Sequence, residues 1–415
     1  MPHRIDAKTL FYGLQNMGYS PADSIADIID NSIEAKAKNI DILFWEGSSN
    51  PVVAIIDDGI GMDYAELENA LKIKKDTSPN AKLSKFGFGL KTASFSQCEI
   101  LTIITKKKNQ TNFKCINAKL EPVETNLLTI FKKFKFVEKK FQEKCPTSGT
   151  VIIWENLSNN ITGKNSGIKR THSIFFEVGQ RVTEHAATHF HNFMDDIKIF
   201  FNSREIKKWD PFNAEINSLK IFDEKKFKLD NYYVTVKGYV YPKEDEFFDN
   251  ELYETLGGPL GWFNSQGIYL YREKRLLTHG GWFGLRIGGS NPWQLESKYQ
   301  RCRITINYDS ELDEYFKPNI QKNKSEIPPI IRHDITRYCD EVRKFCNEKR
   351  SSGPLQSNDI NEDIDDLLIK NGDSKYSLNT NHSNIQLLIN KNISSNKREY
   401  ILDQINKQIK KIQDA

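Results

Sequence analysis

Short apolar runs with strand character alternate with segments of helical spacing along the first part of the chain. Short, β-branched runs are typical of buried strands, whereas apolar positions that recur every three or four residues are typical of helices. The runs expected to form strands are residues 40–45, 51–57 and 99–107. The segments expected to form helices are residues 20–37 and 63–72. The first part of the chain is therefore expected to combine strands with helices.

The helix expected over residues 20–37 has an unusual polar stripe. Its start is clear, because Ser20 can cap the helix and Pro21 fits the first helical position. Four polar residues share one face, namely Asp27, Asp30, Asn31 and Glu34. A solvated helix face is the common explanation of such a stripe. The apolar flanks, and the lack of lysine in the stripe before Lys36, favour a cleft, where an acid and an amide can position water and bind a divalent cation.

A turn that contains acids and glycines follows the strand expected at residues 51–57. Its sequence is Asp57-Asp58-Gly59-Ile60-Gly61-Met62. Asp57 stands at the end of the strand, and the two glycines open the chain beside it. A carboxylate in this place can accept a hydrogen bond from the amino group of adenine. An ordinary strand-to-helix turn is the alternative, because Asp and Gly are common in turns.

A second glycine-rich turn leads into a segment with the character of a helix start. Its sequence is Lys85-Phe86-Gly87-Phe88-Gly89-Leu90-Lys91. Gly87 and Gly89 lack a Cβ atom, so the backbone there can approach a ligand closely. A helix start presents free N–H groups and partial positive charge, which suit phosphate, and Lys91 adds a full charge. An ordinary loop before a buried helix explains the same residues if this turn is taken alone.

The chain changes character twice after this region. Residues 166–348 again mix helical and strand patterns, and we expect them to form a second domain after a first domain of residues 1–165. Residues 349–415 are rich in Ser, Asn, Asp and Lys, which favours a flexible linker and a short amphipathic helix near the carboxyl end. Within the second domain we expect a helix at 170–193, strands at 197–202, 232–241 and 303–308, and a hairpin at 266–277.

Composition and charge narrow the function only slightly. A hydrophobic fraction of 38% supports packed cores, and a net charge of +4 allows a nucleic-acid partner without requiring one. A lysine-rich segment over residues 132–140 is interleaved with Phe, and either a solvated face or a nucleic-acid contact would explain it. The six cysteines show no metal-binding spacing. No signal peptide and no bilayer-spanning run is visible, so a cytoplasmic protein without a membrane partner is expected.

Taken together, these segments resemble the motifs of the GHKL ATPases, the superfamily that includes gyrase, the ninety-kilodalton heat-shock chaperones, histidine kinases and MutL. The resemblance rests on four motifs in order, at residues 27–35, 57–62, 86–94 and 148–154. The first and third motifs are most similar to MORC-type and bacterial MORC-like proteins. The resemblance implies an α+β fold, with a GHKL (Bergerat) ATP-binding α/β sandwich and a mixed sheet, then a transducer-like α/β domain and a partly disordered tail.

The resemblance also implies a role for each matching residue. Asp57 would read adenine, Asn31 would bind Mg²⁺, and Asp27 would be the general base, where hydrolysing relatives usually have Glu. In relatives with a transducer a lysine reaches the γ-phosphate, and Lys322 is the favoured match, with Lys324 as the alternative. The residues expected to contact the nucleotide are Asn31, Asp57, Gly59, Gly61, Met62, Gly87, Phe88, Gly89, Leu90, Lys91 and Thr150.

The implied function is a Mg²⁺-dependent ATPase that binds ATP under a lid over residues 73–85 and closes as an ATP-gated homodimer. Duplex DNA is the first expected client by family analogy, in genome maintenance or in defence, and a protein partner is the second. Asp27 is one methylene shorter than Glu, so slow hydrolysis is expected, and Asp30 is expected to be a structural carboxylate. The alternative is a non-hydrolysing, ATP-dependent switch, which a phosphate-release assay distinguishes from an ATPase.

Overall fold

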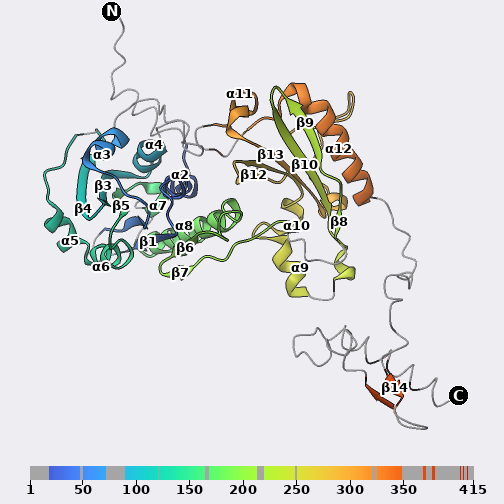
Figure 1. The fold of residues 1–415 in the computed structure, drawn as a ribbon, viewed down its shortest axis with the longest axis horizontal. Coiled ribbons are helices and arrows are strands. Elements are labelled where there is room, and N and C mark those ends of the chain that lie inside the picture. Colours follow the sequence, from blue (N-terminus) through green and yellow to red (C-terminus); the bar gives the residue numbers. More distant parts are fainter. Residues whose placement is uncertain are drawn as a thin grey trace, which may run out of the picture.

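The computed structural model of the chain contains two folded parts that lie side by side, each built on its own sheet (Figure 1). The structure describes residues 18–46, 50–71, 89–119, 121–163, 168–212, 219–247, 250–319, 322 and 325–347, and in the tail 368–370, 376–378, Leu402, Ile405 and Ile409. The expected lid over residues 73–85 lies outside the described residues, as do Gly87, Phe88 and Lys324.

The first sheet has the strand order β4-β3-β5-β2-β1-β6-β7. Its strands are β1 Asn39–Trp45, β2 Val52–Asp57, β3 Cys98–Lys107, β4 Gln110–Asn117, β5 Gly149–Leu157, β6 Lys198–Phe201 and β7 Arg204–Glu205. Strand β6 runs parallel to β1, whereas the other neighbours pair antiparallel. The sheet is therefore mixed, and the predicted α+β class is confirmed.

Helices cover both faces of this sheet (Figure 1). They are α2 Pro21–Glu34, α3 Tyr64–Leu71, α4 Gly89–Phe95, α5 Leu127–Lys133, α6 Lys135–Lys144, α7 Asn159–Thr162 and α8 Ile168–His189. Side chains of α2, α4 and α8 join one core, and those of α5 and α6 join the other. Val53 and Ile55 belong to the first core, whereas Ala54 and Ile56 belong to the second. The double cover explains why β2 is apolar at every position before Asp57.

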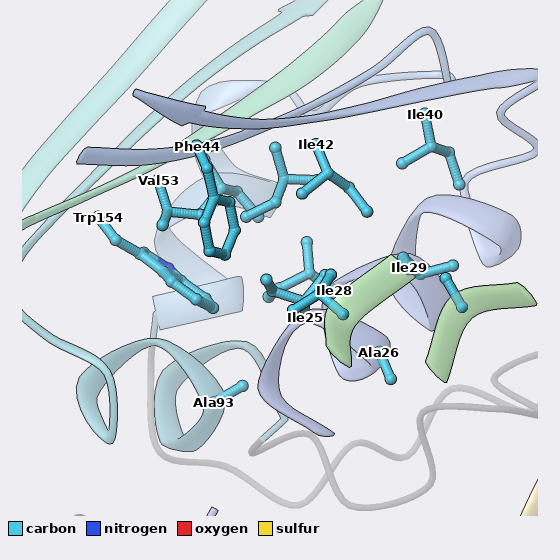
Figure 2. Packing of buried hydrophobic residues seen from close by; sticks show 14 of the residues in the cluster. Ile25, Ala26, Ile28, Ile29, Ile40, Ile42, Phe44, Val53, Ala93 and Trp154 are labelled. Carbon is cyan, nitrogen blue, oxygen red and sulfur yellow. The ribbon is translucent and has the colours of Figure 1, made fainter. Parts of the chain in front are cut away.

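Helix α2 places its isoleucines in the core, and this sets the direction of its polar face. At the amino end, Ser20 Oγ accepts a hydrogen bond from the backbone N–H of Asp23 at 3.1 Å, as the predicted cap requires. Ile25, Ile28 and Ile29 are each 1% exposed and lie among side chains from the strands (Figure 2). Truncating such a side chain to Ala typically costs about 2–5 kcal/mol. The acids occupy the other side of the helix.

The segment that runs from α8 to β7 belongs to the first sheet, although the sequence analysis assigned it to the second domain. Strand β6 pairs with β1, in the register Ile40 to Ile199 and Ile42 to Phe201. Helix α8 contributes Val182 and Ala186 to the core that also contains α2. An apolar helix stripe shows that a helix packs on a sheet, but it does not show which sheet. The expected boundary at residue 165 therefore falls before the last helix and the last two strands of the first part.

The second sheet has the strand order β12-β11-β13-β10-β8, and β9 also pairs with β10. Its strands are β8 Lys220–Ile221, β9 Lys225–Leu229, β10 Tyr232–Val240, β11 Gly267–Arg272, β12 Arg275–His279 and β13 Cys302–Tyr308. The α-helices of this part are α9 Asn250–Gly257, α10 Gly261–Asn264, α11 Asp313–Phe316 and α12 Pro329–Asn347, with short 3₁₀ helices η2 Glu244–Glu246, η3 Ser297–Tyr299 and η4 Ser310–Leu312. Helix α12 packs on the sheet through a core that includes Ile304, Ile306, Ile335 and Val342.

The hairpin predicted at residues 266–277 is present as β11 and β12. Its two loop residues, Glu273 and Lys274, have φ angles of 49° and 68°. Positive φ at both central positions is the geometry of a type I′ turn, whose twist matches that of the flanking strands. The turn places Arg275 at the first position of β12, which is important for the site described below.

The lysine-rich segment over residues 132–140 lies mainly in α5 and α6. Phe134 is buried in the core beneath these helices, whereas Lys133 pairs with Glu155 and Lys140 pairs with Asp41. These contacts agree with the solvated-face interpretation.

In the tail, β14 Leu368–Lys370 and β15 Tyr376–Leu378 form a small antiparallel sheet that was not predicted. The expected carboxyl-terminal helix is helical at its three described residues.

Candidate nucleotide-binding site

The acidic face of α2 is buried against the second part of the molecule. Asp27 is 2% exposed and Asp30 is fully buried, so these two residues do not form a solvated helix face. Lys322 Nζ lies 3.0 Å from Asp27 Oδ1 and 2.6 Å from Asp30 Oδ2. Arg275 Nε lies 2.8 Å from Asp30 Oδ1. Two cations from the second part therefore meet two carboxylates on one helix of the first part.

Local structure holds each of the two cations in place. Lys322 has a φ of 53°, and its backbone N–H donates to the carbonyl of Asn319 at 3.0 Å. Arg275 follows the type I′ turn, and its guanidinium also lies over the ring of Phe190, 4.9 Å from the ring centroid. The prediction favoured Lys322 over Lys324 as the lysine that reaches the site. Lys322 contacts Asp27 directly, whereas Lys324 lies outside the described residues.

Burial and charge act in opposite directions on this cluster. Burial raises the pKa of Asp27 above its ordinary value, and the charge of Lys322 opposes that rise. Burial by itself lowers the pKa of the Lys322 ammonium, yet the charges of Asp27 and Asp30 leave it above its ordinary value. Lys322 is consequently charged at neutral pH. The arrangement joins a buried ammonium to a carboxylate whose burial favours protonation.

Tyr19 is a member of this site that sequence reasoning missed. Its hydroxyl donates to Asp27 Oδ2 at 3.1 Å, and its backbone carbonyl accepts a hydrogen bond from Gln97 Nε2 at 3.0 Å. The side chain is 2% exposed. A tyrosine directly before a capping serine has no pattern that marks it as functional. Only the folded arrangement reveals its contact with Asp27.

Asp57 stands at the end of β2, as predicted, and its carboxylate is held from two sides. Oδ1 accepts the backbone N–H of Gly59 at 2.9 Å, and Oδ2 accepts the hydroxyl of Ser32 at 3.0 Å. Burial raises the pKa of Asp57 to about 6, although these hydrogen bonds oppose the rise. Ser32 was not predicted. It follows Asn31 on α2, so this helix is connected to both Asp57 and the acid cluster.

The two glycines after Asp57 have different steric reasons to be glycine. Gly61 has a φ of +66°, and a Cβ atom built there would lie 1.8 Å from the carbonyl oxygen of Lys106. A Cβ atom on Gly59 would lie 2.8 Å from Cβ of Ala35, close to the end of α2. These contacts allow the turn to pass tightly between α2 and β3. They account for both glycines without reference to a ligand, and a nucleotide contact remains a prediction for both.

Thr150 and Met62 meet through a residue that was not predicted. Thr150 pairs with Asp57 in the register of β2 and β5. Its hydroxyl lies 3.1 Å from that of Thr105 on β3, and Thr105 Oγ1 accepts the backbone N–H of Met62 at 2.8 Å. The sheet order β3-β5-β2 brings these three residues to the turn beside Asp57. A threonine inside an apolar strand gives too little sequence signal to identify Thr105.

The second glycine-rich turn is only partly described. Gly89 begins α4, and a Cβ atom built there would lie 3.8 Å from the carboxyl carbon of Asp27, so this end of α4 faces the acid cluster. Lys91 is 2% exposed, and its Nζ donates to the carbonyl of Ala70 at 2.8 Å. The ammonium of Lys91 is thus bound at the end of α3. A phosphate contact for Leu90 or Lys91 stays a prediction.

Comparison with known proteins supports the resemblance that the motifs suggested. Residues 19–143 match the family described as "Histidine kinase-, DNA gyrase B-, and HSP90-like ATPase". Residues 19–143 are therefore similar to a GHKL-type ATPase domain. The matched residues include α2, the turn after β2 and α4, which are the elements that surround Asp27 and Asp57.

Two kinds of curated relative match part of the chain. The protein "ATPase morc-1" of Caenorhabditis elegans is 30% identical over 87 residues, which is 21% of this chain and 10% of that protein. The "DNA mismatch repair protein MutL" of Buchnera aphidicola is 30% identical over 177 residues, 41% of this chain and 28% of that protein. MutL of Rickettsia rickettsii is 32% identical over 94 residues, which is 21% of this chain and 15% of that protein. The chain therefore spans less than a third of the length of these relatives.

The helix α2 offers one oxygen donor of the kind that Mg²⁺ accepts. Among the described residues, no group of three or more His, Cys, Asp or Glu side chains could hold a metal ion by itself. Mg²⁺ often takes only one or two protein oxygens and completes its octahedron with water and phosphate oxygens. Asn31 is half-buried, it follows Asp30 on α2, and its side chain carries an amide oxygen of the hard type that Mg²⁺ accepts.

Among the described helices, none is both long enough and apolar enough to cross a bilayer.

Proposed function

We propose that the protein is a Mg²⁺-dependent ATPase that closes as an ATP-gated dimeric clamp and acts on DNA. The observation that carries the proposal is the contact of Lys322 with Asp27. A lysine from the second part is buried on the carboxylate that occupies the base position of the GHKL motif. A cation that crosses between two folded parts can neutralise developing phosphate charge, and it links the state of the nucleotide to the arrangement of those parts.

In this proposal each residue of the site has one task. Asp57 accepts a hydrogen bond from the amino group of adenine, beside the bonds that it already receives from Gly59 and Ser32. Asn31 would hold the Mg²⁺ ion, which lowers the charge on the phosphates when it is bound. Asp27 orients the attacking water on the γ-phosphorus. Its elevated pKa moves its basicity towards the range that suits general-base catalysis near neutral pH.

Lys322 has to change partner during the proposed cycle. Its ammonium is shared by Asp27 and Asp30, so a γ-phosphate would compete with two carboxylates for one cation. When Lys322 moves to the phosphate, Asp27 Oδ1 becomes available to accept a hydrogen bond from water. Asp30 retains Arg275 throughout, so the second part stays connected to α2. The two cations therefore differ in their tasks, since one moves to the nucleotide and the other anchors the two parts together.

The first experiment is phosphate release from ATP and Mg²⁺ by wild type and Asp27→Asn, with and without duplex DNA. We expect slow turnover in wild type, an increase with DNA, and a loss of at least about 100-fold in Asp27→Asn, within the range known for general-base removal. ATP affinity, measured in parallel by calorimetry, should be nearly unchanged in the variant. Light scattering with a non-hydrolysable ATP analogue tests the dimer, which should form only with the analogue.

The non-hydrolysing switch is the second candidate, and one observation favours it. Both carboxylate oxygens of Asp27 already have hydrogen-bond donors, Lys322 and Tyr19. If wild type binds ATP and forms dimers but releases no phosphate, ATP acts as an ordering ligand and the ATPase proposal is wrong. Turnover that DNA does not change would leave the ATPase in place and would direct the search for a client to proteins.

A further inference from the structure

The carboxylate of Asp27 is bound from two directions by residues outside α2. Lys322 binds Oδ1 at 3.0 Å, and Tyr19 binds Oδ2 at 3.1 Å. We propose that Tyr19 is a positioning residue for hydrolysis, which holds Asp27 Oδ2 so that Oδ1 is presented to the attacking water. This inference rests on the proposed ATPase function, and it concerns a residue that no GHKL motif of this chain contains.

Tyr19 and Lys322 differ in how firmly each is attached to Asp27. Lys322 comes from the second part, and its shorter contact, at 2.6 Å, is to Asp30. Tyr19 belongs to the same folded part as Asp27. It immediately precedes the cap residue Ser20, and its carbonyl is held by Gln97 Nε2 at 3.0 Å. A movement of Lys322 towards phosphate would therefore release Oδ1 and leave Oδ2 bound to Tyr19.

The direction of the Tyr19 hydrogen bond is fixed by its surroundings. Burial and the nearby negative charge of Asp27 both raise the pKa of the Tyr19 hydroxyl, so the hydroxyl keeps its proton and acts as the donor. When Asp27 is ionised, as the proposed base has to be, its carboxylate has no proton to donate and can only accept this bond. The bond thus stabilises the ionised form of Asp27 and at the same time restricts rotation about its terminal torsion angle.

The shortness of Asp explains why a positioning residue matters here. An aspartate has one methylene fewer than the glutamate usual at this position, so its carboxylate lies further back and has fewer orientations that reach a water. Asp27 also faces the start of α4, where a Cβ atom on Gly89 would lie 3.8 Å from its carboxyl carbon. Displacement of a reacting group by about 1 Å can reduce a rate about 100-fold. A hydrogen bond that holds one oxygen is therefore a substantial part of the proposed base.

The test compares Tyr19→Phe with wild type in the full-length chain, since the substitution removes only the hydroxyl. We expect kcat for ATP hydrolysis to fall by about 10- to 100-fold, while KM and calorimetric ATP affinity change by less than about twofold. Ser24→Ala is the matched control. It removes one hydrogen bond from the same helix, the contact of Ser24 Oγ with Ser96 Oγ at 3.2 Å, and it should keep wild-type kcat.

A double-substitution cycle separates positioning from a general structural role. If Tyr19 acts through Asp27, then adding Tyr19→Phe to Asp27→Asn should change the residual rate by less than about twofold. A structural role would instead lower the rate in both backgrounds, and that result would overturn the inference. Wild-type kcat in Tyr19→Phe would overturn it as well. The two results above refute only this inference, because they require an active wild type. ATP binding without turnover in wild type would instead refute the ATPase proposal and this inference together.

Discussion

Asp30 provides the most direct test of how the two parts of the molecule are connected. Its carboxylate is fully buried, with Arg275 Nε 2.8 Å from Oδ1 and Lys322 Nζ 2.6 Å from Oδ2. Asp30→Asn keeps the size of the side chain and removes its charge. Two buried cations from the second part then face a neutral group on α2. Lys322 retains Asp27, whereas the ion pair of Arg275 with Asp30 is lost.

The magnitude follows from the burial of the pair. Removing one partner of a buried ion pair typically costs about 3–5 kcal/mol, because the remaining charge is left without compensation. The lower end applies here, because Lys322 keeps one carboxylate and the amide oxygen of Asn can still accept one hydrogen bond. We therefore expect Asp30→Asn to lower the free energy of unfolding by about 3 kcal/mol.

The assay is urea unfolding at neutral pH, followed by circular dichroism and by tryptophan fluorescence. In wild type the two signals should report one transition, since the buried ion pairs couple the two sheets. In Asp30→Asn the transitions should separate, which marks independent unfolding of the two parts. Asp313→Asn is the control. Asp313 accepts two hydrogen bonds from Arg272, at 2.7 and 2.8 Å, within the second part alone.

Asp313→Asn should lose a similar amount of stability. Its circular dichroism and its tryptophan fluorescence should still report one transition. A change of less than about 1 kcal/mol in Asp30→Asn, with coincident transitions, would refute the reasoning. Such a result would mean that the cost of desolvating Asp30 and its two cations already cancels their attraction, so that the ion pairs add little net stability.

Two further predictions concern the turn after β2. Burial raises the pKa of Asp57 to about 6, above its unfolded value, so the folded state binds the proton more tightly and loses stability as the pH rises from about 4 to 6. Asp57→Asn should therefore be more stable than wild type by up to about 3 kcal/mol above that range, with no gain below it, when urea unfolding is measured across pH. Gly61→Ala should lose about 2 kcal/mol or more, because φ is +66° and Cβ would lie 1.8 Å from the Lys106 carbonyl oxygen. Gly281→Ala is its control in the same unfolding assay, since φ there is +74° but nothing lies within 4 Å, and an equal loss in both variants would exclude the contact as the cause.

Sequence patterns were sufficient for the local structure around the site. The apolar run before Asp57 predicted β2, and Ser20 with Pro21 predicted the start of α2, because capping and strand burial act over a few neighbouring residues. The helix end was less exact, since α2 ends at Glu34 and not near residue 37. The spacing of Asp27 and Asp30 also placed them correctly on one face of the helix.

Contacts between distant segments could not be predicted in the same way. Tyr19 and Thr105 carry no local signal, because a tyrosine before a cap and a threonine in a strand are ordinary residues until the fold brings them to Asp27 and Met62. Arg275 belongs to the hairpin predicted at residues 266–277, but nothing in that pattern marks it as part of the site. Its partner, Asp30, is 245 residues away in sequence. Helix α8 likewise had a clear apolar stripe, but the sheet that it covers was decided by β6 pairing with β1.

The sequence by itself therefore determined which residue types stand at the ends of α2 and β2, since hydrogen-bonding caps, glycine turns and apolar periodicity depend on nearest neighbours. Tertiary structure decided the environment of those residues. Asp27 and Asp30 could be solvated or buried with the same helical spacing, and the approach of Lys322 and Arg275 from the second part decided that they are buried and paired. The physical reason is that burial and charge pairing depend on distances in space, which a helical or strand period does not specify.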